Sequence, residues 1–101
     1  MVARKLHHDD INLGDAVRIQ STADEGEFSG LDVEGNIDDF KISANHTSLI
    51  SQLNVNFEYD GVEYVGNIKT FMSDAPRGGE MDLYCDSKLY HSGIPVEFEL
   101  L

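Results

Sequence analysis

The chain has no tryptophan and little cysteine, proline or positive charge. Its 101 residues include one cysteine, two prolines and only seven lysines or arginines. The single Cys85 cannot form an intramolecular disulfide, so cysteine usage gives no indication of an oxidising compartment. No stretch of sequence approaches the roughly 20 apolar residues that a membrane span requires. These absences favour a soluble protein of the cytoplasm.

The opening residues, MVARKLHHDD, turn polar where a secretory signal would need its apolar core. They show no stable periodicity, and we expect residues 1–10 to form a flexible N-terminal arm that only a partner orders. No Pro/Gly/Ser-rich linker divides the remaining residues, whose number suits one domain. We therefore expect residues 11–101 to form a single β domain.

Charge of one sign dominates the composition. Nineteen acidic residues against seven basic ones give a formal net charge of -12. Such a field repels phosphate backbones and anionic membranes, so we expect neither direct nucleic-acid binding nor membrane binding. The acidity either serves solubility alone or points to a basic partner and the mimicry of a polyanion.

Apolar side chains recur at every second position in the clearest strand of the sequence. Leu53, Val55, Phe57 and Tyr59 fall on one face, and the residues between them are polar. The Asp-Gly pair at 60–61 then suits a tight reversal, because Gly and Asp tolerate positive φ. This pattern predicts a β-hairpin that continues through Ile68.

The rest of the chain reads as further short strands separated by Gly, Asp, Asn and Ser. One short helix, over Asn45 to Gln52, is compatible with the placement of Leu49 and Ile50. The sequence therefore predicts an all-β fold, a small antiparallel β-sandwich or barrel with at most one short helix. The other strands are expected at Ala16 to Ser21, Leu31 to Ile37, Phe40 to Ala44, Glu80 to Asp86 and Ile94 to Leu100.

The hydrophobic core is expected from the apolar members of these strands, because alternate side chains share one face of a sheet. This prediction names Val17, Ile19, Leu31, Val33, Phe40, Ile42, Leu53, Val55, Phe57, Tyr59, Leu83, Val96 and Phe98.

Carboxylates alternate along one predicted strand, at Asp32, Glu34 and Asp38. If the strand continues through them, they project from one face and attract a cation or a basic surface. A calcium loop would need a sharp Gly-assisted turn and a distant bidentate Glu, and the sequence offers neither at the required places. We therefore interpret these residues as a solvated acidic face, and we predict no metal site.

No group of residues has the pattern of a catalytic centre. His7 and His8 are adjacent and lack the separated spacing that would converge on one metal ion. His46 and His91 have no recognisable nucleophile and orienting group beside them. Cys85 alternates with apolar residues and is expected to point into the core. We therefore predict a protein that binds rather than catalyses, with no cofactor.

The irregular stretch SDAPRGG at 73–79 is longer than a hairpin connection requires. Its two interpretations are a plain surface loop and a contact loop presented by a rigid sheet. Together with the N-terminal arm it holds three of the seven basic residues, which distinguishes both segments from the acidic strands. The predicted partner-binding residues are Arg4, Lys5, Asp74, Pro76 and Arg77.

From Glu58 to Asp86 the chain runs strand, Asp-Gly turn, strand, polar loop, and then GGEMDLYCD. This order resembles the C-terminal half of the small head-tail joining proteins of lambda-like tailed phages. The earlier GDAVRIQSTADEGEFSGLDVEGNIDDF is similar to their first hairpin in a looser form. Unlike that family, the chain continues beyond Lys88 with a further strand, and Gln52-Leu53-Asn54 stands where Gly-Asp often precedes the hairpin.

The resemblance implies a virion structural protein, a head-tail connector that forms homo-oligomeric rings through contacts between protein subunits and has no catalytic activity. A second hypothesis is an acidic inhibitor that binds a basic nucleic-acid-processing protein, with carboxylates such as Asp32, Glu34 and Asp38 in place of phosphates. A small-molecule enzyme or sensor is a third possibility and would require a concave pocket with convergent polar groups.

Overall fold

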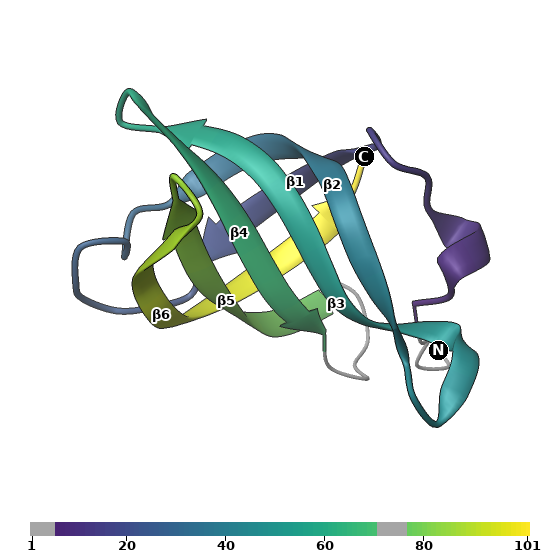
Figure 1. Ribbon diagram of the computed structural model, residues 1–101. Helices are drawn as coiled ribbons and strands as arrows, with labels where there is room; N and C mark the ends of the chain where they lie inside the picture. Colours follow the sequence, from purple (N-terminus) through teal and green to yellow (C-terminus); the bar gives the residue numbers. More distant parts are fainter. Residues whose placement is uncertain (1–5, 71–76) are drawn as a thin grey trace.

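The computed structural model describes residues 6–70 and 77–101, and their strands close into one antiparallel barrel (Figure 1). Each strand pairs with the next along the chain, and the last pairs back with the first. The all-β prediction is confirmed, and of the two predicted architectures the chain adopts the barrel. The strands are β1 (Ala16–Ser21), β2 (Asp32–Ser43), β3 (His46–Tyr59), β4 (Val62–Thr70), β5 (Arg77–Cys85) and β6 (Lys88–Leu100).

The predicted reversal at Asp60-Gly61 joins β3 to β4. Both residues have positive φ, 54° and 79°, and Tyr59 pairs with Val62 across the turn. Two consecutive positive φ angles are what a two-residue hairpin of the right twist requires, and Asp-Gly is among the sequences that accept them. The hairpin prediction is confirmed.

Two strands expected at Leu31 to Ile37 and Phe40 to Ala44 form the single strand β2. The pairing of β2 with β3 shifts register between Ile37 and Asp39, so Asp38 is an extra residue in the ladder. A bulge of this kind bends a strand and changes which side chains face inward. It brings Phe40 into contact with the core, whereas Ile42, expected in the core, is 43% exposed and lies beyond a second register shift near the end of the strand.

The helix expected over Asn45 to Gln52 does not form, because β3 runs from His46 to Tyr59. Leu49 and Ile50 are adjacent and both buried, which gave the segment its helix-like spacing. Ile50 belongs to the main core cluster, whereas Leu49 is buried outside it and pairs with His7 in an isolated bridge. Both faces of this end of β3 are therefore buried, which gives its sequence an apolar spacing similar to that of a helix.

The segment before β1 packs against β3. Leu6 is 4% exposed and accepts a backbone hydrogen bond from the Ile50 amide at 2.9 Å. A short 3-10 helix, η1 (His8–Asp10), follows. Residues 6–10 of the expected arm therefore contact the barrel, and residues 1–5 lie outside the described residues. Within the described part of the chain, no helix is long and apolar enough to cross a membrane.

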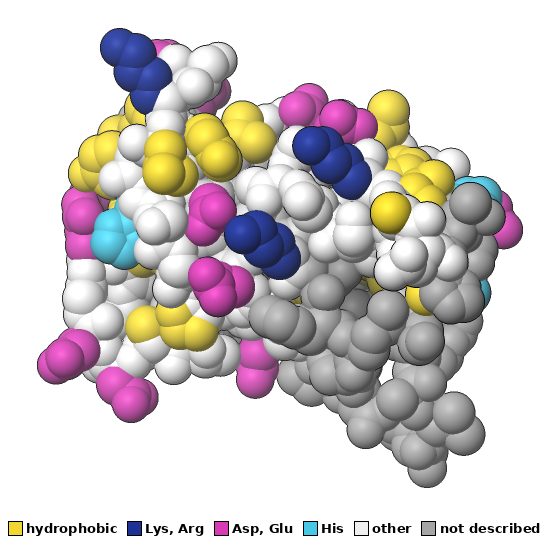
Figure 2. Space-filling model, turned by 60° about the horizontal axis from the view of Figure 1, so that its bottom comes forward, with side chains coloured by type: hydrophobic (Ala, Val, Ile, Leu, Met, Phe, Trp, Pro, Cys, Tyr) yellow, Lys and Arg dark blue, Asp and Glu magenta, His cyan; other side chains and the backbone are white. Residues whose placement is uncertain are grey.

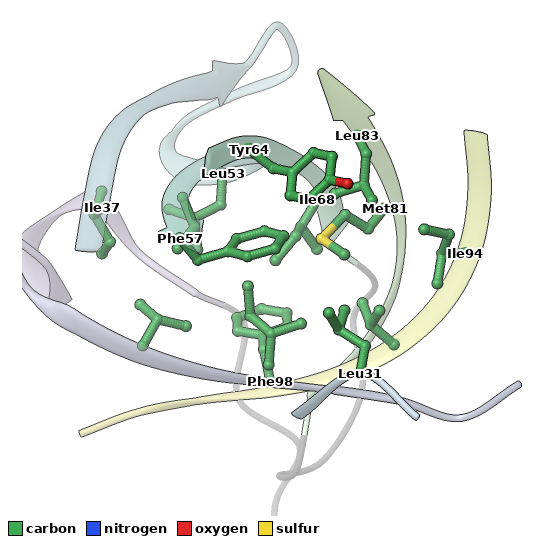
Figure 3. Packing of buried hydrophobic residues seen from close by; sticks show 14 of the residues in the cluster. Leu31, Ile37, Leu53, Phe57, Tyr64, Ile68, Met81, Leu83, Ile94 and Phe98 are labelled. Atoms are coloured by element: carbon green, nitrogen blue, oxygen red, sulfur yellow. The ribbon is translucent and has the colours of Figure 1, made fainter. Parts of the chain in front are cut away.

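The barrel interior is filled by hydrophobic side chains, which converge from all six strands and from the chain around Phe28 and Leu31 (Figure 3). Most of the predicted core is buried, and Val33, Phe40 and Tyr59 are partly buried against it. The buried hydrophobic residues that the prediction omitted are Leu6, Ile11, Phe28, Ile37, Leu49, Ile50, Tyr64, Ile68, Met81 and Ile94.

Candidate functional site

Hydrophobic side chains fill the described part of the barrel interior. Among the described residues no polar or charged side chain is buried, and no buried side-chain nitrogen or oxygen lacks a hydrogen-bond partner. Residues 6–70 and 77–101 also hold no cluster of three His, Cys, Asp or Glu side chains arranged as metal ligands. Candidate sites of the described chain therefore lie on its outer surface.

The acidic face predicted on β2 is partly neutralised by β1. Arg18 Nε and Nη2 donate to the two carboxylate oxygens of Asp32 at 3.0 and 2.9 Å. This hydrogen bond lowers the pKa of Asp32 below its ordinary value, and the charge of Arg18 lowers it further. Glu34 and Asp38 are exposed on the same strand, with Glu34 directly opposite Arg18. Asp32 therefore presents less negative charge to a partner than Glu34 and Asp38 do.

The predicted partner-binding residues fall mostly outside the described chain. Arg4, Lys5, Asp74 and Pro76 lie there. Arg77 is the first residue of β5, and its Cα is paired with that of Phe98 on β6. Arg77 thus begins a strand directly after the 71–76 segment. Of the five predicted residues, it is the one that lies within the described part of the chain.

A hollow of about 970 Å³ lies on the outer surface across β2, β3, β4 and β5. The strand register places its lining residues in rows. One row contains Asn36, Asn56, Val65 and Tyr84, each paired with the next across adjacent strands. We call this site the amide hollow and define it by Asn36, Gln52, Asn54, Asn56, Asn67 and Tyr84.

Hydrogen bonds fix the orientation of amides in the hollow. Asn67 Nδ2 donates to Asn54 Oδ1 at 2.6 Å and to Gln52 Oε1 at 3.2 Å. The Gln52 and Asn54 amides therefore direct their oxygens toward Asn67 and keep their nitrogens for other partners. Asn36 Nδ2 is engaged by the Gly14 carbonyl at 3.0 Å, which leaves the Asn36 oxygen as an acceptor. The hollow thus presents both donors and acceptors in set directions.

One end of the barrel is closed by aromatic rings. Phe28, from the chain between β1 and β2, is 4% exposed and lies 5.8 Å from Tyr59 and 6.1 Å from Tyr64 between ring centroids. Its ring also contacts Tyr90 and His91 at 6.1 and 5.3 Å. Tilted and edge-on ring pairs at these separations are favourable, so Phe28 holds its chain segment across the barrel end.

Hydrophobic side chains are exposed around this closed end. Leu89 is 57% exposed, Tyr90 52% and Val62 40%, and we call these three residues the barrel-end patch. Figure 2 shows hydrophobic side chains gathered at the left, which is the end carrying the β5–β6 turn, beside a lysine and a histidine. Tyr90 Oη donates to Glu27 Oε1 at 3.0 Å, and this bond raises the pKa of Tyr90. At this end of the barrel, exposed apolar side chains therefore lie next to the carboxylate of Glu27.

Neither the amide hollow nor the barrel-end patch was predicted as a site. The alternation of Asn54 and Asn56 on the polar face of β3 was visible in the sequence, but Asn36, Asn67 and Tyr84 join them only through strand register. Comparison with protein-family models, with curated proteins and with solved structures finds no match. The function of the chain is therefore inferred from the surface of this barrel.

Proposed function

We propose that the chain is a non-enzymatic structural subunit, a head-tail connector of a virion, that assembles by contacts between protein subunits. The barrel-end patch is the observation that carries this proposal. Leu89 and Tyr90 remain more than half exposed although the barrel interior is filled, and the Tyr90 ring contacts Phe28 and Tyr64 at the edge of that interior. Apolar side chains left exposed at one end of a domain are a feature of surfaces that contact another protein.

The occupant that we propose for the patch is a second copy of the chain. The carboxylate of Glu27 lies against Tyr90, and Asp60 and Asp86 stand in the turns at the same barrel end. A neighbour that inserts apolar side chains here would also need positive charge at the rim. Arg4, Lys5 and Arg77 are the scarce basic residues that we assign to that role.

An interface between two different surfaces of the same chain is heterologous, and such contacts close into rings when the rotation between subunits allows it. A ring is the assembly that the sequence resemblance to head-tail joining proteins implies. The resemblance runs from Glu58 to Asp86, which includes the end of β3, β4, the 71–76 segment and β5, and in a looser form from Gly14 to Phe40. Patch, charge and resemblance support the same assembly.

Native mass spectrometry of the wild type and of a Leu89→Ser, Tyr90→Ser double variant tests this proposal. Leu13→Ser is the matched control, because Leu13 is 62% exposed and lies before β1, outside the patch. We expect a discrete oligomer for the wild type and for the control, and monomers for the double variant. A wild type that stays monomeric at every concentration would contradict the proposal, as would an oligomer unaffected by the double substitution.

The acidic-inhibitor function remains a second candidate because of one pair of like charges. Glu58 and Glu63 are exposed and stand directly opposite each other on β3 and β4. Like charges in cross-strand pairs are destabilising, and a basic partner bound over them would relieve that cost. This candidate requires one-to-one binding to a basic nucleic-acid-processing protein, and a symmetric ring of this chain alone would count against it.

A further inference from the structure

We infer that the amide hollow is a binding site for a neutral saccharide. Its volume of about 970 Å³ falls within the roughly 300–1,000 Å³ of small-molecule sites. Its occupant is therefore expected to be a compact molecule or a short length of a chain. This inference is independent of the proposed assembly at the barrel end.

The charge of the hollow selects against anionic ligands. Glu34, Glu58, Glu63 and Asp86 line it, and Lys41 is the one basic residue among the described lining residues. Phosphate or carboxylate groups would meet repulsion from these four acidic side chains. A neutral molecule with hydroxyl groups meets no such repulsion, because carboxylate oxygens accept hydrogen bonds from hydroxyls.

The amides match hydroxyl groups in kind. An amide offers two donors and an oxygen acceptor, and a hydroxyl both donates and accepts, so adjacent hydroxyls on a ring can pair with adjacent amides. Asn54 and Asn67 stand directly opposite each other, and their mutual hydrogen bond fixes their orientation before any ligand arrives. Groups held in place in this way lose little conformational entropy on binding.

The amide hollow also has an apolar side. The row that begins with Asn36 and Asn56 ends with Val65 and Tyr84, so amides and an aromatic residue lie on the same surface with Val65 between them. A sugar ring has polar edges and a face of C–H groups, and an aromatic side chain offers contact area for such a face together with a polar hydroxyl.

Titration of the ¹⁵N-labelled chain with three neutral trisaccharides tests the inference. The probes are maltotriose, cellotriose and N,N′,N″-triacetylchitotriose, and the signals are the side-chain amides of Asn54, Asn56 and Asn67. We expect at least one probe to shift these signals. Tyr84→Ala and Asn56→Ala should each weaken that binding about tenfold, as expected for one lost stacking or hydrogen-bonding partner. Gln20→Ala, an exposed amide of β1 outside the hollow, should leave it unchanged.

The Asn56→Asp variant distinguishes the binding of a saccharide from the binding of a cationic ligand. Asn56 is exposed, so the variant is expected to fold, and the change removes two donors and adds a negative charge. Saccharide binding should weaken, whereas binding of a tetralysine peptide would strengthen. Absence of any shift with the three probes would overturn the inference. Shifts that survive both Tyr84→Ala and Asn56→Ala, or that only tetralysine produces, would overturn it as well.

Discussion

Arg18 on β1 is paired with Glu34 on β2, and its side chain reaches diagonally across the ladder to hydrogen-bond Asp32 on the same strand. Two of its nitrogens meet the two carboxylate oxygens of Asp32 at 3.0 and 2.9 Å. A planar guanidinium and a carboxylate form two parallel hydrogen bonds in this geometry. One of the three acidic residues that the sequence places on a common face is therefore already engaged within the chain.

The first prediction concerns the titration of Asp32. Because its folded-state pKa is lowered, its contribution to stability is present above the unfolded pKa and is lost as pH falls through the folded one. Carboxyl ¹³C NMR should show Asp32 titrating below the ordinary Asp range in the wild type and returning to that range in Arg18→Gln. An unchanged Asp32 titration in this variant would contradict the assignment of the hydrogen bond as its cause.

The second prediction compares two apolar residues of the expected core. Phe57 is 5% exposed with its ring 5.9 Å from that of Tyr64, whereas Ile42 is 43% exposed. Truncation of a buried Phe typically costs about 3–5 kcal/mol, so Phe57→Ala should lower the free energy of unfolding by that amount. Ile42→Ala should cost less than about 1 kcal/mol. Chemical denaturation that ranks the two in the reverse order would show that the faces of β2 and β3 are misassigned.

The third prediction rests on the close approach of β2 and β3 at Gly35. A Cβ on this buried glycine would overlap the backbone oxygen of Asn56 and lie 2.7 Å from Val55 Cγ1. Backbone atoms cannot move aside as a flexible side chain does, so Gly35→Ala should destabilise the barrel by roughly 1–3 kcal/mol. Gly30→Ala is the control, because nothing lies within 4 Å of a Cβ there. Equal melting temperatures for the two variants would refute this prediction.

The fourth prediction uses the opposed pair Glu58 and Glu63. Replacement of one carboxylate by a cation turns repulsion across the hairpin into attraction, so Glu63→Lys should stabilise the chain by about 0.2–1 kcal/mol. The gain should shrink at high salt, which screens exposed charges. Denaturation at two salt concentrations measures both effects, and a destabilised Glu63→Lys would mean that Glu63 has a favourable role in the fold.

Local chemistry was enough to predict part of the fold. The Ala16 to Ser21 strand and the Asp60-Gly61 turn depend on alternation and on positive φ, and both are properties of neighbouring residues. The end of β3 near Leu49 depends instead on contact with His7, some forty positions earlier in the sequence. The apolar residues at this end of β3 are buried by two separate surfaces, so they follow neither the period of a strand nor that of a helix. The secondary structure of this segment could therefore not be assigned from the sequence alone.

The candidate sites were less accessible to sequence analysis for the same reason. Asn54 and Asn56 were recognised as the polar face of a strand, but the amide hollow also needs Asn36 and Tyr84, which arrive from two other strands. Tyr90 and Leu89 were not singled out, because no local pattern in the sequence shows that Tyr90 packs against Phe28 or that Leu89 stays exposed. Strand register and the closure of the barrel bring these residues together, and both are properties of the whole barrel.

Native mass spectrometry of two charge variants at two salt concentrations tests the central claim, assembly of the chain into a connector ring, most directly. One variant carries Arg4→Ala, Lys5→Ala and Arg77→Ala, and the other carries Asp32→Asn, Glu34→Gln and Asp38→Asn. We predict a closed homo-oligomer for the wild type, its dissociation in the first variant and its retention in the second, because the cations supply the attraction to an acidic neighbour. A monomeric wild type that binds a basic protein, with binding weakened only in the second variant, would contradict the claim and favour the inhibitor.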